Sequence, residues 1–484
     1  MNTVELNTEN EIANANYVLQ KKNGVWSAMG SGMNARVVCF MVDADKNLYA
    51  GGFFTTADGN AALGIAKWNW VAWAALADGG LSGGVSPACY AIVGMPDGRL
   101  FAAGAFTDAG GTAAKGIAVH DGTNWSSIGD LLTTALDPGH GYALAKDPDG
   151  NIYVGGLFAT AGGVAASNIA KWDGTTWSAL GAGCNNYVTG LLWGIDGNLY
   201  ASGVFTQAGG VAAIGIAKWD GANWSAVGGD CAGASAAGYA IAQRANGEII
   251  LGGSFTSVAG VDANYVAAWN GSAWRALGDG VNGGVQALGF DPSGNLIVGG
   301  VFTMIGGLTI GAQIGVWNWS TWQPLDVDLP GTPTVYAVRS DEETLYIGFD
   351  SAGIALTAGA ALSTIENEGT AKTYPKFTIS RSGGTTAKLQ SIRNLTTGHA
   401  LLFDWPLQDG EIVTIDLTPG QKQINSTVTP NAIDKLLASS DLGSFCMDPG
   451  ENEITLYISS VGSPTLTALI QWETQFATLD GAAL

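Results

Sequence analysis

Residues that usually carry catalytic or metal chemistry are scarce in this chain of 484 amino acids. Only three histidines occur, His120, His140 and His399, and His120 replaces a tryptophan within a repeated segment. No nucleophile elbow, phosphate-binding loop or histidine-rich metal-ligand spacing is present. Acidic segments such as Asp43-Ala44-Asp45 recur where turns are expected and lack the further ligands of a calcium-binding loop. The sequence therefore predicts no catalytic residues, no metal site and no cofactor.

Cysteine is also sparse, with five residues and no Cys-x-x-Cys pair. Cys184 and Cys231 occupy the same position in two consecutive repeats, in loops expected to converge toward a common axis. A disulfide between them would require their Cα atoms to lie within about 7 Å. The alternative, which we favour, is that these residues are free thiols packed as small apolar side chains.

Positive charge is scarce, because 20 Lys and Arg face 41 Asp and Glu and leave a net charge of −21. This balance argues against nucleic acid and anionic membrane surfaces as partners, since both require clustered basic residues. No apolar run of 18 residues occurs, so no membrane insertion is predicted. The opening segment MNTVELNTENEIANANY has neither a basic nor an apolar signal region, which predicts synthesis in the cytoplasm without a signal peptide.

Glycine, by contrast, is abundant at 72 residues, and a segment with two aromatic residues recurs along the chain. KWDGTTW (171–177) returns as KWDGANW (218–224), and five more variants place the last tryptophan of each copy at 26, 73, 125, 274 and 322. A period of this size predicts a repeat architecture. Asp-Gly between apolar runs predicts a hairpin with a two-residue type I′ turn at Asp173 and Gly174. The repeated tryptophans are expected to pack between neighbouring repeats.

Each repeat has a second half, a turn followed by a strand that ends in a motif such as GGLF (155–158) or GGVF (299–302). Four short strands per unit of this length predict propeller blades. The chain opens with the second half of a unit, 16–30, and the repeats end with a first half, about 335–353. We therefore predict an all-β fold in which 1–355 form a seven-bladed β-propeller with a split closing blade.

The repeat stops after the propeller, and 356–369 read as a linker of small and polar residues. Period-2 patterns resume without a repeat in segments such as KFTISR (376–381) and GEIVTIDLTPG (410–420). These patterns predict that 370–484 form an antiparallel β-sandwich.

The C-terminal segments RNLTTGHALLFDW, GEIVTID, DPGENEITLYI and TALIQWETQFATLDGA, in this order, resemble the galectin-like C-terminal domain of phage tail family (Dit-like) proteins. The propeller units resemble the GG-x-F repeats of Rax2-type and other bacterial seven-bladed propellers, which implies fold alone. The N-terminal ring-forming domain of Dit-like proteins is absent, and the propeller stands in its place. The resemblance implies a virion component that is made in the host cytoplasm. Its sandwich would bind other tail, baseplate or fibre proteins, and such components are commonly homo-oligomers.

Two hairpin turns depart from the repeat, because Trp70 and Trp319 stand where other copies have glycine. The split blade lies between the sixth and first blades, so Trp319, the Lys21/Lys22 turn and Trp70 are expected to form one arc on the rim. Aromatic faces beside polar side chains suit sugar rings or a partner protein. The alternative is that the two rings cover neighbouring apolar surface.

Three functions remain open from the sequence. The first is a non-enzymatic tail-associated protein whose propeller presents a binding surface for a host-surface glycan or protein. The second is a free carbohydrate-binding lectin or adhesin, which would need a secretion route. The third is a glycan-processing enzyme, which would need carboxylates converging near the propeller axis.

Overall fold

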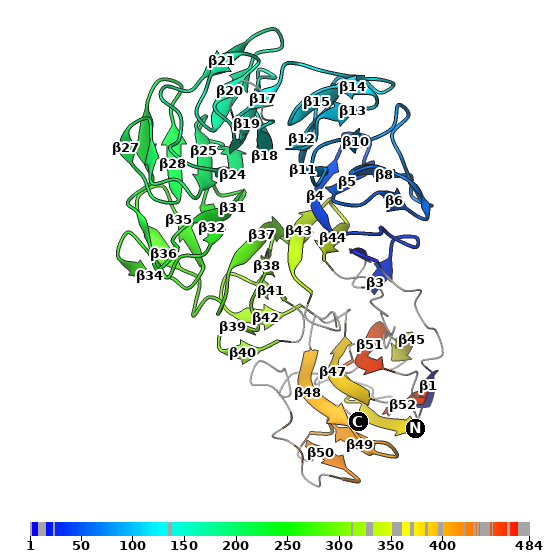
Figure 1. The fold of residues 1–484 in the computed structure, drawn as a ribbon. Coiled ribbons are helices and arrows are strands. Elements are labelled where there is room, and N and C mark those ends of the chain that lie inside the picture. Colours follow the sequence, from blue (N-terminus) through cyan, green and yellow to red (C-terminus); the bar gives the residue numbers. More distant parts are fainter. Residues whose placement is uncertain are drawn as a thin grey trace.

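The computed structural model describes residues 2–7, 16–22, 25–133, 138–310, 313–325, 333–350, 361–367, 372–382, 386–394, 400–419, 422–428, 432, 435, 446–447, 449–461 and 465–472. Regular structure within these ranges consists of strands. Figure 1 shows a ring of small sheets with a second β domain beside it, next to β3 (Val25–Ala28) and β42 (Trp322–Pro324). The predicted all-β propeller followed by a sandwich is therefore confirmed.

The ring contains seven four-stranded antiparallel sheets within the described residues. We call their strands A to D from the centre outward. Blades 1 to 3 consist of β4 (Val37–Val42), β5 (Leu48–Gly52), β8 (Ile65–Trp68) and β9 (Trp73–Ala74); β11 (Ala88–Gly94), β12 (Leu100–Ala105), β15 (Ile117–His120) and β16 (Trp125–Ser126); and β18 (His140–Lys146), β19 (Ile152–Leu157), β22 (Ile169–Trp172) and β23 (Trp177–Ala179).

Blades 4 to 6 consist of β24 (Val188–Trp193), β25 (Leu199–Gly203), β28 (Ile216–Trp219) and β29 (Trp224–Ala226); β31 (Gly238–Gln243), β32 (Ile249–Gly253), β35 (Val266–Trp269) and β36 (Trp274–Ala276); and β37 (Val285–Phe290), β38 (Leu296–Gly300), β41 (Ile314–Trp317) and β42 (Trp322–Pro324). The closing blade consists of β43 (Val335–Ser340), β44 (Thr344–Phe349), β2 (Val18–Lys22) and β3 (Val25–Ala28).

The closing blade joins the two ends of the repeat region. Strand β2 pairs antiparallel with β44, from Val18 opposite Gly348 to Lys22 opposite Thr344. The A strand β43 contacts both β37 of blade 6 and β4 of blade 1. The ring is therefore closed by backbone hydrogen bonds, as the unpartnered halves predict.

Short antiparallel strands form hairpins within the B–C loops. They are β6 (Thr56–Ala57) with β7 (Asn60–Ala61); β10 (Leu81–Ser82), β13 (Asp108–Ala109) and β14 (Thr112–Ala113); β17 (Leu131–Leu132), β20 (Thr160–Ala161) and β21 (Val164–Ala165); β26 (Gln207–Ala208) with β27 (Val211–Ala212); β30 (Cys231–Ala232), β33 (Ser257–Val258) and β34 (Val261–Asp262); and β39 (Met304–Ile305) with β40 (Leu308–Thr309). Three of these sheets also include a strand from the preceding D–A loop, which ties neighbouring blades together.

The glycine pair of the GG-x-F motif faces a β-bulge in strand A. In blade 3 the bulge falls between Gly141 and Ala143, opposite Gly155 and Gly156 of strand B. A Cβ on Gly156 would lie 1.9 Å from the carbonyl oxygen of His140. The backbones approach too closely for any side chain, so the motif requires glycine here.

The repeated tryptophans join adjacent blades. Trp177 is buried, and its Nε1 donates a hydrogen bond of 2.6 Å to the carbonyl oxygen of Ile128 in the preceding blade's D–A loop. Trp224 donates in the same way to Leu180 over 2.8 Å. The Trp172 and Trp177 rings lie 5.4 Å apart, with the first ring half-buried. The structure thus agrees with a packing role for this pair.

The hairpin turn between these tryptophans differs from the predicted two-residue type I′ turn. Trp172 and Trp177 are opposite one another, which leaves a four-residue loop. Asp173 Oδ1 accepts hydrogen bonds from the backbone N–H groups of Thr175 and Thr176, at 2.8 and 2.7 Å. These bonds hold the pKa of the Asp173 carboxyl well below its usual range. Only Gly174 has a positive φ, 98°, because the aspartate side chain takes over the role of a second turn residue.

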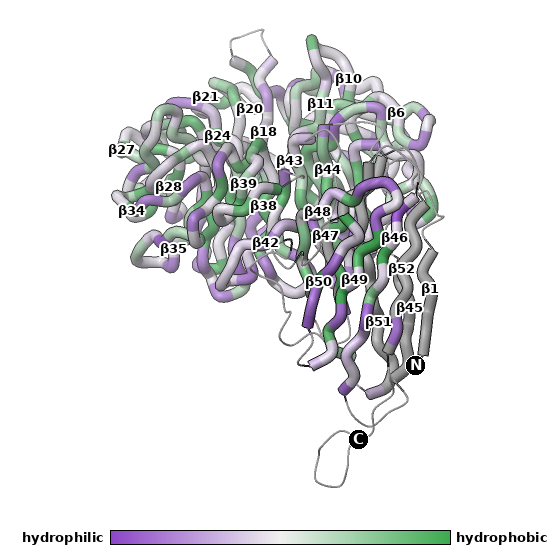
Figure 2. Tube along the Cα trace, turned by 90° about the horizontal axis from the view of Figure 1, so that it is seen from below, coloured by the Kyte–Doolittle hydropathy of each residue, from purple (hydrophilic) through white to green (hydrophobic). Residues whose placement is uncertain are grey.

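The second domain is a two-sheet sandwich. One sheet has the order β1 (Asn2–Asn7), β52 (Thr465–Trp472), β46 (Lys376–Ser382), β49 (Ile412–Asp416) and β50 (Gln423–Ser426). The other has the order β45 (Ala361–Asn367), β51 (Gly450–Val461), β47 (Thr386–Asn394) and β48 (Ala400–Leu407). Phe377, Ile379, Leu389 and Trp405 are among the residues of its buried core. Figure 2 shows hydrophilic and hydrophobic residues alternating along β48 and β49, which is typical of strands with one buried face.

The sandwich extends beyond the predicted boundaries of 356–369 for the linker and 370–484 for the domain. Strand β1, at the start of the range 1–355 predicted for the propeller, pairs with β52. Strand β45, within the predicted linker, pairs with β51. Sandwich strands therefore flank the propeller repeats on both sides in sequence. The single strand β1 has no repeat to identify it, and its partner lies at the other end of the chain.

The predicted alternative of a Cys184–Cys231 disulfide does not form, because both residues are free thiols. Each pairs with the outer B–C hairpin of the blade that follows its D–A loop, Cys184 opposite Ala208 and Cys231 opposite Val258. The loops that carry them therefore do not bring the two sulfurs together at the axis. Burial raises the pKa of each thiol to about 12.

The close cysteine pair lies elsewhere, on the inner strands β4 and β11. A Cβ placed on Gly51 would lie 2.4 Å from Cys39 Sγ and 3.0 Å from Cys89 Sγ. Both are free thiols, and burial raises the pKa of Cys89 well above its ordinary value. The position of the two cysteines could have indicated this pair. Each lies directly beside the bulge in the inner strand of its own blade, and the two blades are adjacent.

The bulge contact predicts the effect of Gly156→Ala. The new methyl group would collide with the His140 carbonyl, so unfolding free energy should fall by about 1–3 kcal/mol. Gly284→Ala is the matched control, because its Cβ would meet Gln286 Nε2 at an ordinary 3.7 Å. Thermal denaturation of both variants measures the difference, and equal melting temperatures would show that the bulge tolerates a side chain.

The thiol environments predict slow reaction with a disulfide reagent such as DTNB. The thiolate is the reactive form, and raised pKa values keep Cys89, Cys184 and Cys231 protonated at pH 8. The native protein should therefore react slowly at these positions, whereas unfolded chains should release five equivalents without a reducing agent. Fewer than five equivalents after unfolding would reveal a disulfide.

Candidate functional site

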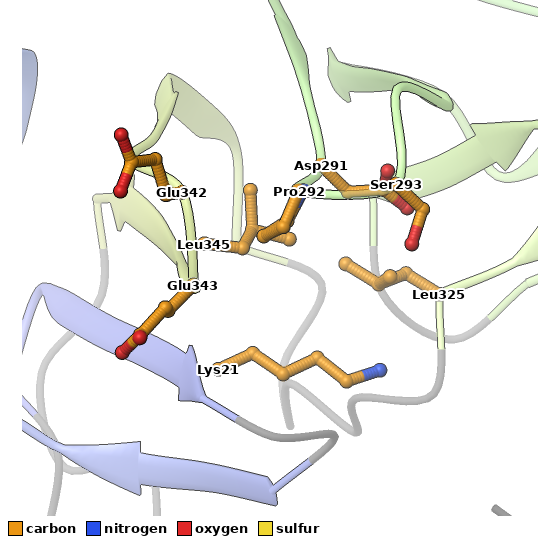
Figure 3. Close-up of a pocket in the computed structure, with 8 residues that line it drawn as sticks. All are labelled: Lys21, Asp291, Pro292, Ser293, Leu325, Glu342, Glu343 and Leu345. Atoms are coloured by element: carbon orange, nitrogen blue, oxygen red, sulfur yellow. The ribbon is translucent and has the colours of Figure 1, made fainter.

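A pocket of about 500 Å³ lies between blade 6 and the closing blade, at the end of the ring where the A–B and C–D turns lie. The residues that line it are Lys21, Asp291, Pro292, Ser293, Leu325, Glu342, Glu343 and Leu345. Figure 3 shows the Lys21 side chain along one side of the pocket, with Glu343 near its base and Leu325 near its ammonium end. The pocket thus combines an apolar floor with charged groups of both signs.

Ion pairs hold the acidic side chains of this pocket. Lys22 Nζ lies 3.0 Å from Glu343 Oε2 within the closing blade. Lys46 Nζ lies 2.7 Å from Glu342 Oε2 and so connects blade 1 to the closing blade. The hydrogen bond from Lys46 to Glu342 raises the pKa of the lysine above its ordinary value. These pairs are exposed, so they orient the side chains and contribute little stability.

The Asp291 side chain stabilises the A–B turn in which it lies. Its carboxylate accepts hydrogen bonds from the backbone N–H and the side-chain amide of Asn295, at 2.8 and 2.9 Å. Asp147 makes the same two bonds to Asn151 in blade 3. The acidic A–B turns are therefore structural at these positions. Among the residues that the structure describes, no three His, Cys, Asp or Glu side chains gather in a way that could hold a metal ion.

The Trp319 side chain packs against residues of blades 5 and 6. Its Nε1 donates a hydrogen bond of 2.9 Å to the Gly294 carbonyl, and its ring stacks on Phe290 with centroids 6.3 Å apart. The Arg244 guanidinium of blade 5 lies 3.6 Å from the centre of the ring. Glu248 holds Arg244 through a 3.2 Å ion pair. Trp319 thus covers neighbouring surface, as the alternative interpretation expected, and braces the turn that forms one wall of the pocket.

Trp70 is in a different environment. Its side chain is 47% exposed, and the adjacent Val71 is 82% exposed. Asn69 Oδ1 accepts hydrogen bonds from the N–H groups of Val71 and Ala72, at 3.0 and 2.8 Å, which fixes the turn. Trp70 adopts a φ of 72° and Trp319 at the matching position of blade 6 adopts 71°, a conformation for which the remaining copies use glycine. A non-glycine residue here costs roughly 1–3 kcal/mol, and such strain is found at functional sites.

The residues of the predicted arc lie on three consecutive blades, and whether they act as one surface stays a prediction. Trp319 braces the pocket wall on blade 6, Lys21 and Lys22 lie on the closing blade, and Lys46 links that blade to blade 1, which carries Trp70. Within the described part of the chain, Trp70 makes no ring or ion-pair contact with the other members. The sequence missed the acidic turn Glu342-Glu343 and Lys46, because only closure of the ring brings them together.

Two of the three histidines lie in the described part of the chain. His120 is buried, and its Nδ1 accepts a 3.1 Å hydrogen bond from the backbone N–H of Gly122. Burial lowers the pKa of His120. His140 lies at the start of β18, and His399 lies outside the described residues. The structure also contains no helix, within its described ranges, that is long and apolar enough to cross a membrane.

Two family descriptions match parts of the sequence. Residues 368–476 match the siphovirus-type tail component, C-terminal domain. Residues 244–267, in blade 5, match a β-propeller domain of unknown function, DUF5122. No curated protein matches the chain in sequence.

Several solved structures are similar at low sequence identity. The extracellular domain of a one component system from B. thetaiotaomicron is 10% identical with a TM-score of 0.46, and the match covers 86% of this chain and 48% of that protein. This chain therefore spans about half the length of that protein. Virginiamycin B lyase from Staphylococcus aureus is 10% identical with a TM-score of 0.41, with 72% of this chain and 98% of that protein covered. The WD40 β-propeller domain of Doa1 is 11% identical with a TM-score of 0.40, with 69% and 97% covered.

These matches agree with the two parts seen in the structure. The tail-component match lies within the sandwich, and the propeller match lies within a blade. The chain therefore combines a β-propeller with a C-terminal region that is similar to the C-terminal domain of the siphovirus-type tail component.

Proposed function

We propose that this protein is a non-enzymatic structural component of a phage tail or tail-like particle, and that its propeller presents a receptor-binding surface. The observation that carries the proposal is the match of residues 368–476 to the siphovirus-type tail component C-terminal domain. A domain of this family indicates a virion location and association with other tail proteins. The sandwich attaches the chain to the tail, baseplate or fibre, and repeated copies form a homo-oligomer there.

The way the two domains are joined supports a presenting role for the propeller. Strands β1 and β45 flank the propeller repeats in sequence, and both belong to the sandwich. Two covalent connections restrict the orientation of a domain more than one does. A receptor-binding surface held in this way keeps a defined direction relative to the particle.

The surface that we assign to the receptor is the rim around Trp70 and the pocket between blade 6 and the closing blade. Trp70 offers an exposed aromatic face, and Lys21 and Glu343 offer polar groups in a pocket with an apolar floor. A sugar presents both apolar C–H faces and hydroxyl groups, so a host-surface glycan suits this combination.

Location on the particle is the first test of the proposal. Antibodies against the sandwich should label purified tails or tail-like particles in electron micrographs, and the chain should sediment with them. Free chain in every fraction and unlabelled particles would contradict a structural role.

Replacement of Trp70 tests the receptor surface. Trp70→Gly removes the aromatic face and relieves the positive φ, so the free energy of unfolding should stay the same or rise by up to about 2 kcal/mol. Binding of the full chain to host cells and to a glycan array should fall at least about tenfold, because stacking on an aromatic ring is lost. Ile195→Ala is the matched control, since Ile195 is 71% exposed on the A–B turn of blade 4, outside the arc. Unchanged binding by Trp70→Gly would remove the rim from the proposal.

A further inference from the structure

Each inner strand of the propeller carries a β-bulge at the same place. The register shifts next to one residue in every A strand of the ring. The bulged residues are Val38, Tyr90, Tyr142, Thr189, Tyr239, Gln286 and Tyr336. A bulge leaves its extra residue unpaired and redirects the side chain, and bulges are common next to binding sites. Tyrosine at four of these positions is unexpected, because the bulge itself requires no aromatic residue.

Five aromatic rings form a continuous belt at this level. They are Phe53, Tyr90, Tyr142, Tyr187 and Tyr336, and Arg36 lies among them; we call these six residues the aromatic belt. Phe53 and Tyr90 have ring centroids 5.6 Å apart, and Tyr90 and Tyr142 have centroids 5.2 Å apart. Tyr142 and Tyr187 follow at 6.2 Å. The belt therefore extends from the closing blade through blades 1, 2 and 3 to blade 4.

The belt lies at the opposite end of the ring from the rim pocket. The bulges are near the start of each A strand, where the D–A loops enter, whereas the pocket is built from A–B turns. Figure 1 shows the A strands around the centre of the ring, with the sandwich beside the ring rather than across that centre. Tyr187 is 40% exposed, and the other five members are half-buried. A ligand can thus reach the belt without displacing the sandwich.

Arg36 sets the charge of the belt. Its guanidinium carbon lies 3.8 Å from the centre of the Phe53 ring and 5.3 Å from that of Tyr336. These rings occupy the faces of the guanidinium, and in the described part of the chain Arg36 forms no ion pair. Its N–H groups point along the guanidinium plane and are matched to a carboxylate, which accepts two parallel hydrogen bonds from arginine. An arginine without a carboxylate partner is notable in a chain of net charge −21.

The remaining groups of the belt suit a sugar. Tyrosine rings offer flat apolar faces for the C–H faces of a pyranose, and their hydroxyl groups can donate and accept hydrogen bonds. His140 Nδ1 lies 3.3 Å from the Tyr142 hydroxyl, which orients that group. Gln286 supplies an amide at the bulge position of blade 6, whereas the Thr189 hydroxyl of blade 4 already donates a 2.9 Å hydrogen bond to the Gly238 carbonyl. We propose that the aromatic belt binds a carboxylate-bearing saccharide, with the carboxylate on Arg36 and the sugar ring against the tyrosines.

This site is separate from the rim surface and does not depend on the proposed function. It uses no residue of the Trp70 rim or of the pocket. A result at the belt therefore leaves the rim and particle experiments unaffected.

The test is isothermal titration calorimetry of the full chain with two probes. One is a disaccharide that ends in glucuronic acid, and the other is the neutral disaccharide that differs only in having CH₂OH in place of the carboxylate. We expect the acidic probe to bind at least about tenfold more tightly than the neutral one, because a hydrogen bond to a charged group contributes more than a neutral one.

Two variants assign the binding to the belt. Arg36→Gln should weaken the acidic probe by about tenfold or more and leave the neutral probe unchanged, whereas Tyr142→Phe should weaken both. Arg99→Gln is the matched control, because Arg99 pairs with Asp97 over 2.8 Å on the other end of the ring. No binding of the acidic probe, equal affinity for the two probes, or equal losses in Arg36→Gln and Arg99→Gln would overturn the proposal. Thermal denaturation of each variant distinguishes lost binding from lost folding.

Discussion

The antiparallel pairing of β2 with β44 is the interaction on which the rest of the structure depends. A blade packs mainly against its two neighbours, so an open row of blades would leave two exposed faces and free strand edges. The pairing of Val18–Lys22 with 344–348 joins the ends of the repeat region and removes those edges. It also places Lys21 and Lys22 beside Glu342 and Glu343, so that the rim pocket exists only in the closed ring.

The two ends of the ring have different chemistry. At the end with the A–B turns, several acidic side chains pair with lysines or arginines or accept hydrogen bonds within their own turns, and Trp70 offers an exposed aromatic face. At the other end, tyrosines come together with an arginine that has no acidic partner in the described part of the chain. Both ends are built on the same repeated backbone, and their difference comes from side chains at a few turn and bulge positions.

Much of this architecture follows from the sequence because the repeat exposes it. The tryptophan pairs and GG-x-F motifs recur for physical reasons: a tryptophan such as Trp177 bonds to the preceding blade, and Gly156 lies too close to a backbone carbonyl for any side chain. Unique features were harder to predict. Strand β1 has no repeated counterpart, the Asp173 side chain replaces a predicted turn residue, and a bulge is invisible in an alternating pattern. The aromatic belt was missed for the last reason, since three of its residues, Tyr90, Tyr142 and Tyr336, occupy bulge positions.

The placement of β1 and β45 affects how the protein carries a mechanical load. These strands lie at corresponding edges of the two sandwich sheets and contact each other. A pull on the propeller is therefore transmitted to both sheets at once, through two strands held by rows of backbone hydrogen bonds. Each strand carries part of the force, and neither sheet can be peeled away alone.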